Sequence, residues 1–127
     1  MESFAVLGAP GSIGASTLEL IARPPDRYRA AVLTAHSNVE KILPLCERFR
    51  PSRVVMVDRK SAQQLRALLA SATWAKGMEV HDGEAALAEV AASPEVDAEV
   101  AGSVGAAGLG AALSAAAAGK KILQDNK

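Results

Sequence analysis

The stretch "GAPGSIG" (Gly8–Gly14) decides the fold of this chain. Its three glycines, Gly8, Gly11 and Gly14, lie three residues apart, after a short apolar run and before a helix-like segment. At a strand-to-helix turn of this kind, the first Gly permits the sharp turn. The second lets a diphosphate approach the backbone, and the third lets helix and strand pack closely. The unpaired N–H groups at the helix start can then bind a phosphate without a cationic side chain.

The glycine spacing alone leaves two interpretations of this loop open. G-x-x-G-x-x-G is a variant of the dinucleotide-binding pattern, and a dinucleotide site is the interpretation that we favour. The alternative is a glycine turn that holds no ligand. A Walker-type nucleotide loop is excluded, because no Lys-Ser or Lys-Thr pair follows Gly14.

Strand-like and helix-like segments alternate along the rest of the chain through short links. The pattern predicts strands at 3–8, 28–36, 53–57, 78–81, 96–101 and 121–123, and helices at 12–23, 39–49, 60–70, 83–92 and 105–118. Several strands are continuous apolar runs, as in sheets that are buried on both faces. We therefore expect an α/β fold: a Rossmann-like, doubly wound parallel sheet with helices on both faces, forming one NAD(P)-binding domain over 1–127.

The helix expected at 39–49 has two notable positions. Asn38 directly precedes it and is a suitable N-terminal cap. Pro44 lies inside it and removes a backbone hydrogen bond, so we expect the helix to kink or split there.

Composition narrows the class of protein. The 14 basic residues balance the 14 acidic ones, so no charge excess favours a nucleic acid or an anionic membrane as partner. A single Cys excludes an intramolecular disulfide framework and a cysteine-based zinc cluster. The start of the chain has neither the basic nor the long apolar segment of a signal peptide. We expect a cytoplasmic protein that does not enter membranes.

The end of the second strand indicates which dinucleotide would bind. NAD sites usually place Asp or Glu there to hold the ribose 2′-hydroxyl, but this end reads "TAHSN" (Thr34–Asn38) and has no carboxylate. Ser37 and Asn38 can donate hydrogen bonds, and His36 can add positive charge when protonated. These residues favour NADPH, although His36 could also be an ordinary solvent-facing histidine.

Three segments together resemble the 1-deoxy-D-xylulose 5-phosphate reductoisomerase family. They are "LGAPGSIGASTLELIA" (Leu7–Ala22), "VGAAGL" (Val104–Leu109), and "AGKKIL" (Ala118–Leu123) followed by Asn126-Lys127. The resemblance covers the whole chain in order and is strongest in the first two segments. It implies a Rossmann-like NADPH-binding domain of an oxidoreductase of non-mevalonate isoprene biosynthesis.

The resemblance also implies roles for individual residues. The family's diphosphate-binding turn falls on Pro10, Gly11, Ser12 and Ile13, with Gly8 and Gly14 flanking it. Its contacts to the 2′-phosphate and ribose fall on residues 36–38. Asn126 would contact the nicotinamide side of the cofactor, and Lys127 the phosphosugar substrate. The family usually has Thr where this chain has Pro10, which lacks a backbone N–H.

The family enzyme continues with a metal-binding catalytic domain and a C-terminal helical domain. The carboxylates that hold Mg²⁺ or Mn²⁺ lie in that region, so the resemblance implies no metal site and no catalytic residue within these 127 residues. We therefore expect the isolated chain to be inactive, while the family enzyme is a homodimer. A stand-alone nucleotide-binding regulatory module and a ligand-free Rossmann scaffold remain alternatives.

Overall fold

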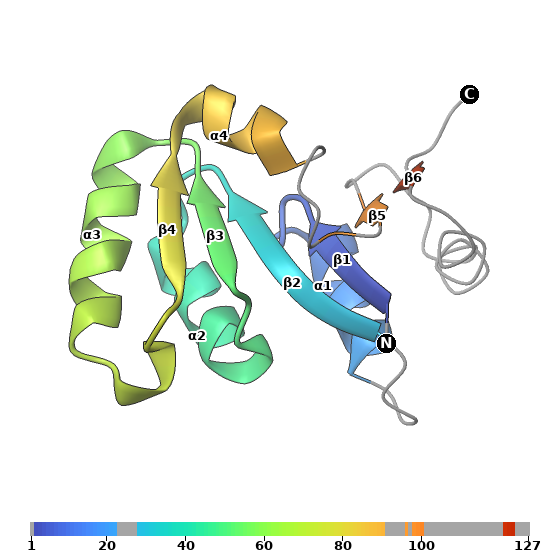
Figure 1. The fold of residues 1–127 in the computed structure, drawn as a ribbon, viewed down its shortest axis with the longest axis horizontal. Coiled ribbons are helices and arrows are strands. Elements are labelled where there is room, and N and C mark those ends of the chain that lie inside the picture. The colour runs from blue at the N-terminus through green and yellow to red at the C-terminus, as the bar shows by residue number, and fades with distance from the viewer. Residues whose placement is uncertain (1, 23–27, 91–95, 97, 101–120, 124–127) are drawn as a thin grey trace.

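The computed structural model describes residues 2–22, 28–90, 96, 98–100 and 121–123 (Figure 1). Strands and helices alternate as β1 (Glu2–Val6), α1 (Ser12–Ile21), β2 (Tyr28–Ala35), α2 (Val39–Phe49), β3 (Arg53–Met56), α3 (Arg59–Ala70), the 3₁₀ turn η1 (Thr73–Ala75), β4 (Glu79–Asp82), α4 (Gly83–Val90), β5 (Ala98–Val100) and β6 (Lys121–Leu123). The helix expected at 105–118 lies outside the described residues.

The strands form one parallel sheet in the order β4-β3-β2-β1-β5-β6. Successive strands step outward from β1 to β4 on one side, and the chain then returns to the other side of β1 (Figure 1). This reversal at β1 defines a doubly wound sheet, and the expected fold class is confirmed. In such sheets, ligands bind outside the carboxyl ends of the strands, near the point of reversal.

The two faces of the sheet are covered by different helices. Side chains of α1, α2 and α3, among them Leu18, Ile42 and Leu65, share one core cluster with Phe4 and Leu33 of the sheet. The other face carries a second cluster, in which strand residues of β1, β2 and β3 meet α4. Its buried members are Ala5, Ala31, Val32, Val55, Val90 and Val96. The central strands are thus buried on both faces, which explains why their sequences are continuously apolar.

The expectation that Pro44 would split its helix is wrong, because α2 runs without interruption through that residue. Pro44 is exposed, so the carbonyl that loses its helical donor can be hydrated. The buried side chains of Val39, Ile42 and Cys46 hold both halves of the helix against the core. The Asn38 side chain caps the first turn, as expected, by accepting a hydrogen bond from the Lys41 N–H.

The edge strand β4 is tied to the neighbouring helix α3 by Arg66. Nε and Nη2 of Arg66 donate to the carbonyl oxygen of Val80 at 3.1 and 2.8 Å, and Nη2 lies 3.6 Å from Asp82 Oδ2. A free edge carbonyl would offer a pairing site to another strand. Arg66 therefore both fastens β4 and blocks its edge.

We expect Arg66→Ala to lower the free energy of unfolding by about 0.5–1.5 kcal/mol, because the bonds to Val80 are lost at an exposed site. Chemical denaturation measures this change, and Arg59→Ala, on the exposed start of the same helix, is the matched control. Equal stabilities of the two variants would show that Arg66 does not fasten the edge strand.

Candidate functional site

The glycine loop leaves β1 through a tight turn. Gly8 has φ of +68°, in the left-handed region where a side chain is strained. The N–H of Gly11 donates to the Gly8 carbonyl at 2.9 Å and closes the turn. Gly8 therefore ends the strand earlier than the sequence pattern predicted, and Gly11 becomes the residue that precedes α1.

Gly14 lies where the first turn of α1 crosses the loop. A Cβ atom at this position would be 2.5 Å from the Gly8 carbonyl oxygen and 2.6 Å from that of Ala9. At Gly11 the nearest atom to a Cβ would be the Gly8 oxygen, at 3.3 Å. Close packing of the helix on the loop therefore requires Gly at position 14, which is the role expected for the third glycine of the motif.

Thr34, near the end of β2, fixes the other side of the loop. Its Oγ1 accepts a hydrogen bond from the Gly8 N–H at 3.0 Å, and its carbonyl accepts one from the Ala9 N–H at 2.8 Å. Sequence reasoning assigned no role to Thr34. The signal that could have identified it is a hydroxyl residue in an otherwise apolar strand, where a buried polar group needs a partner.

The first turn of α1 has backbone N–H groups that the helix itself does not use. The helical hydrogen bonds begin with Ala15 N–H to Gly11 O, so the N–H groups of Ser12, Ile13 and Gly14 precede them. No side chain caps this end, and no acidic residue lies in the first turn. The positive end of the helix dipole therefore faces the loop, and the first turn itself supplies no carboxylate to neutralise it. Pro10, in the same turn, contributes no N–H.

The three residues after β2 lie at the same edge of the sheet as the loop. His36, Ser37 and Asn38 are exposed, and they lead into the first turn of α2. Because Thr34 binds the loop directly, the two segments are brought together, as expected. The cap bond from Lys41 N–H to Asn38 Oδ1 occupies the oxygen of the Asn38 amide, at 3.1 Å. That bond leaves the NH₂ group as the part of the side chain that can donate to a ligand.

A carboxylate that sequence reasoning missed lies beside His36. Asp58 follows β3, the strand next to β2, and its N–H donates to the His36 carbonyl at 2.9 Å. Its Oδ2 caps α3 by accepting from the Ser61 hydroxyl at 2.7 Å and from the Ser61 N–H at 3.0 Å. These bonds, with the charges of His36 and Lys60, hold the pKa of Asp58 below its ordinary value. Asp58 is brought to the end of β2 only by the parallel pairing of β2 with β3, which the local sequence does not show.

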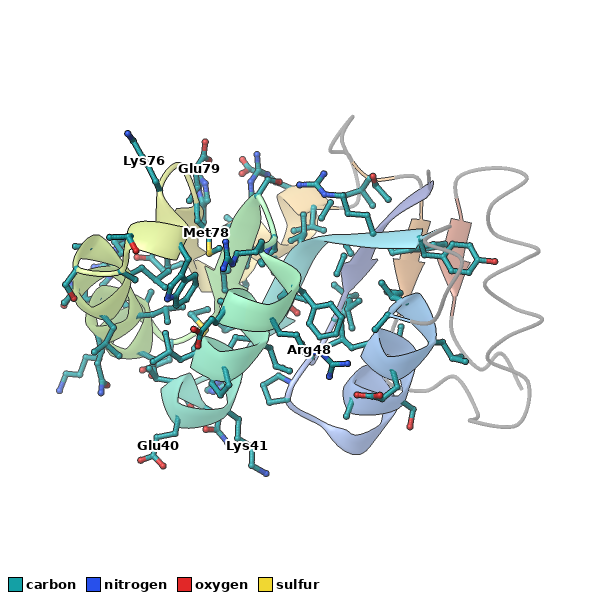
Figure 2. The ribbon with its side chains drawn as sticks, turned by 90° about the horizontal axis from the view of Figure 1, so that it is seen from below. Glu40, Lys41, Arg48, Lys76, Met78 and Glu79 are labelled. Carbon is teal, nitrogen blue, oxygen red and sulfur yellow. The ribbon has the colours of Figure 1, made fainter. Side chains whose placement is uncertain are left out.

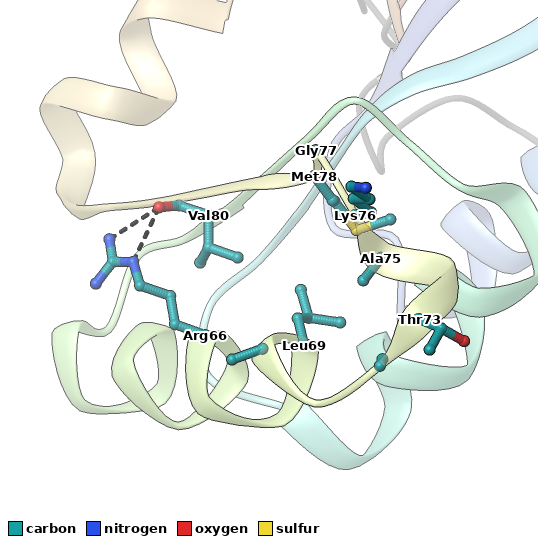
Figure 3. Close-up of a pocket in the computed structure, with 10 residues that line it drawn as sticks. Arg66, Leu69, Thr73, Ala75, Lys76, Gly77, Met78 and Val80 are labelled. Carbon is teal, nitrogen blue, oxygen red and sulfur yellow. Dashed lines mark hydrogen bonds between the residues drawn. The ribbon is translucent and has the colours of Figure 1, made fainter.

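Other expected features lie elsewhere or outside the described residues. Asn126 and Lys127 belong to the part of the chain that the structure does not describe. Among residues that it does describe, no group of three His, Cys, Asp or Glu side chains could hold a metal ion, and no helix combines the length and apolarity of a membrane span. A cavity of about 740 Å³ lies between α3, η1 and β4, near Arg66 and Leu69, rather than at the glycine loop (Figure 3).

Comparison with known proteins links this chain to one family. The family model for 1-deoxy-D-xylulose 5-phosphate reductoisomerase matches residues 4–127. An enzyme of that name from Pseudomonas putida is 51% identical over 126 residues, covering 99% of this chain and 31% of the relative. Another enzyme of that name, from Aromatoleum aromaticum, is 50% identical over 127 residues, covering 100% of this chain and 31% of the relative.

Two solved structures are similar along the described fold. The enzyme from Zymomonas mobilis in complex with NADPH has a TM-score of 0.74 and 38% identity, covering 98% of this chain and 32% of its own. A DOX-P reductoisomerase in complex with NADPH, fosmidomycin and magnesium has a TM-score of 0.78 and 41% identity, covering 99% of this chain and 30% of its own. The chain thus spans about a third of the length of these relatives.

We expect Gly14→Ala to lower the free energy of unfolding by about 1–3 kcal/mol, because the added methyl group has no room between helix and loop. Thermal or chemical denaturation measures the loss. Gly11→Ala is the matched control and should cost less, since its methyl group meets a single atom at 3.3 Å. Equal losses would contradict the packing described for Gly14.

Asp58 predicts a pH dependence of stability. Because its pKa is lowered in the folded state, its contribution is present above the unfolded pKa of about 3.9 and is lost as the pH falls through the folded value. We expect Asp58→Asn, which keeps a capping oxygen, to flatten the fall in melting temperature below about pH 4. Glu79, whose pKa is also lowered, makes the same contribution to the pH dependence of stability in the wild type and in the variant. Superimposable pH profiles would contradict the assignment.

Proposed function

The chain belongs to the 1-deoxy-D-xylulose 5-phosphate reductoisomerase family, and from this premise we propose that it is the NADPH-binding domain of such an enzyme. The single observation that carries the proposal is the uncapped N-terminus of α1, held against the glycine loop by the close approach at Gly14. Similar structures contain NADPH, which fits this arrangement.

The glycine loop would hold the cofactor's diphosphate. The N–H groups of Ser12, Ile13 and Gly14 and the positive end of the α1 dipole would face its oxygens. Gly8 and Gly11 would keep the loop narrow enough for backbone contact, and Pro10 would shape the turn without donating. This cradle needs no basic side chain, in agreement with the absence of Lys and Arg from residues 8–14.

The segment after β2 would select NADPH over NADH. The NH₂ group of Asn38, the Ser37 hydroxyl and a protonated His36 can each donate to a 2′-phosphate, and the start of α2 points its dipole toward the same region. The carboxylate of Asp58 instead caps α3, where its Oδ2 accepts two hydrogen bonds from Ser61.

The activity that we propose for the whole protein is the conversion of 1-deoxy-D-xylulose 5-phosphate to 2-C-methyl-D-erythritol 4-phosphate in isoprene biosynthesis, in the cytoplasm and as a homodimer. When bound, NADPH supplies the hydride for the reduction. Within this chain, Asn126 would contact the nicotinamide side and Lys127 the phosphosugar substrate. A magnesium or manganese ion would be held by other residues of the whole protein. The described residues of this chain include no group of three His, Cys, Asp or Glu side chains that could hold a metal ion.

The domain boundary 1–127 is part of this proposal, and so is the expectation that the chain alone turns over no substrate. A ligand-free scaffold is the second candidate function, and the observation that favours it is Pro10. Its ring removes one N–H from the turn where the family usually has Thr. An empty loop and a diphosphate cradle differ in whether NADPH binds at all.

We expect the nicotinamide fluorescence of NADPH to change saturably when the chain is added, with NADH binding at least about tenfold more weakly. Failure to bind at millimolar NADPH would leave the scaffold as the function. Equal affinities for the two cofactors would contradict the role given to residues 36–38.

The variant Asn38→Asp tests whether the NH₂ group of Asn38 contributes to the selection of NADPH over NADH. Asp keeps the oxygen that caps α2 but replaces the donating NH₂ with negative charge, so we expect the ratio of NADPH to NADH affinity to fall by about tenfold or more. Asn38→Ser is the matched control, since Ser also caps a helix and adds no charge. An unchanged ratio in Asn38→Asp would place the 2′-phosphate elsewhere.

A further inference from the structure

A second cavity, of about 260 Å³, lies at the opposite end of the sheet from the glycine loop. Its lining includes Arg29 at the start of β2, Ser52 just before β3, and Gly77 shortly before β4. Those are the amino ends of three parallel strands, whereas the glycine loop follows the carboxyl end of β1. The four residues of β3 alone separate the two ends by about 13 Å. The cavity is therefore distinct from the proposed cofactor site.

Three cationic side chains from separate segments line this cavity. Arg29 comes from β2, Arg50 follows α2, and Lys76 belongs to the turn before β4. Figure 2 shows Lys76 extending outward from that turn. Among the described residues, no carboxylate lines the cavity and none forms an ion pair with these three side chains.

The nearby acid Glu79 is engaged elsewhere. Its Oε1 lies 2.8 Å from His81 Nε2 and 4.0 Å from Arg53 Nε. The positive charge of the cavity is therefore not balanced by this side chain, and it is available to an anion from solution.

Arg50 is the most unusual residue of the lining. Its φ of +50° is the only positive value of a non-glycine residue among those described, at a helix end where Gly is the usual choice. The side chain is also held in place: Nε donates to the Glu47 carbonyl at 2.8 Å, and the guanidinium carbon lies 5.7 Å from the centre of the Trp74 ring. Arg50 thus keeps a backbone conformation that Gly would adopt more easily, with its guanidinium beside the cavity.

We propose that this cavity binds a small phosphate-bearing anion, separately from the glycine loop. Guanidinium and ammonium groups together suit a phosphate dianion, since Arg offers a planar pair of donors and Lys a compact charge. The anion could be inorganic phosphate or a phosphomonoester, because both present the same charged group. The volume accommodates either of them.

The chain contains a single Trp, so its fluorescence and its indole N–H resonance report on this cavity alone. We would titrate the 127-residue chain with inorganic phosphate, and separately with glycerol phosphate, at constant ionic strength kept by sodium chloride. Saturable changes at low millimolar concentration are expected for both anions. A lower midpoint for glycerol phosphate would mean that the cavity also contacts the ester's carbon atoms.

Two variants and one control complete the experiment. Arg50→Gly should weaken phosphate binding at least about tenfold, while its melting temperature stays equal or rises, because Gly relieves the strain. Lys76→Gln should weaken binding without altering the backbone, and it keeps the test valid if Arg50→Gly does not fold. Arg59→Gln, an exposed cation at the start of α3, should bind as the wild type does. A wild-type response no larger than that to chloride, or unchanged binding in both variants, would overturn the proposal.

Discussion

The structure depends on the close approach of the first turn of α1 to the backbone of Gly8 and Ala9. At Gly14 the carbonyl oxygens of both residues lie too near for any side chain, so helix and loop meet backbone to backbone. This contact fixes the direction in which α1 leaves β1 and packs Leu18 and Ile21 against the sheet. It also determines where the N–H groups of the first helical turn point, and so joins the stability of the fold to the proposed binding of a diphosphate.

Thr34 extends this constraint to the next strand. Its hydroxyl and carbonyl bind the loop, so the end of β2 and the start of α1 are held as one unit. Residues 36–38 follow shortly after Thr34, so their position depends on that link and on the cap that Asn38 makes on α2. The described residues of the proposed cofactor site are thus positioned by backbone geometry and by short polar side chains. A separate group of cations, Arg29, Arg50 and Lys76, lines the cavity at the other end of the sheet.

Much of this arrangement could be predicted from the sequence because the signals are local. The glycine spacing predicted the turn and the role of Gly14, the apolar runs predicted the buried parallel strands, and Asn38 was recognised as a cap. What was missed depends on neighbours in space. Thr34 and Asp58 matter through the adjacent strand or loop, and Pro44 is tolerated because tertiary packing of α2 outweighs the loss of one exposed hydrogen bond. Strand order and the cavity beside Arg50 are likewise set by long-range packing.

The central claim is that the backbone N–H groups of Ser12, Ile13 and Gly14, in the first turn of α1, hold the diphosphate. The most direct measurement is the change in amide ¹H–¹⁵N chemical shifts when NADPH is added to the chain. The account predicts the largest changes at Ser12, Ile13 and Gly14, with smaller ones at residues 36–38. Saturable NADPH binding that leaves those three amides unmoved would contradict it.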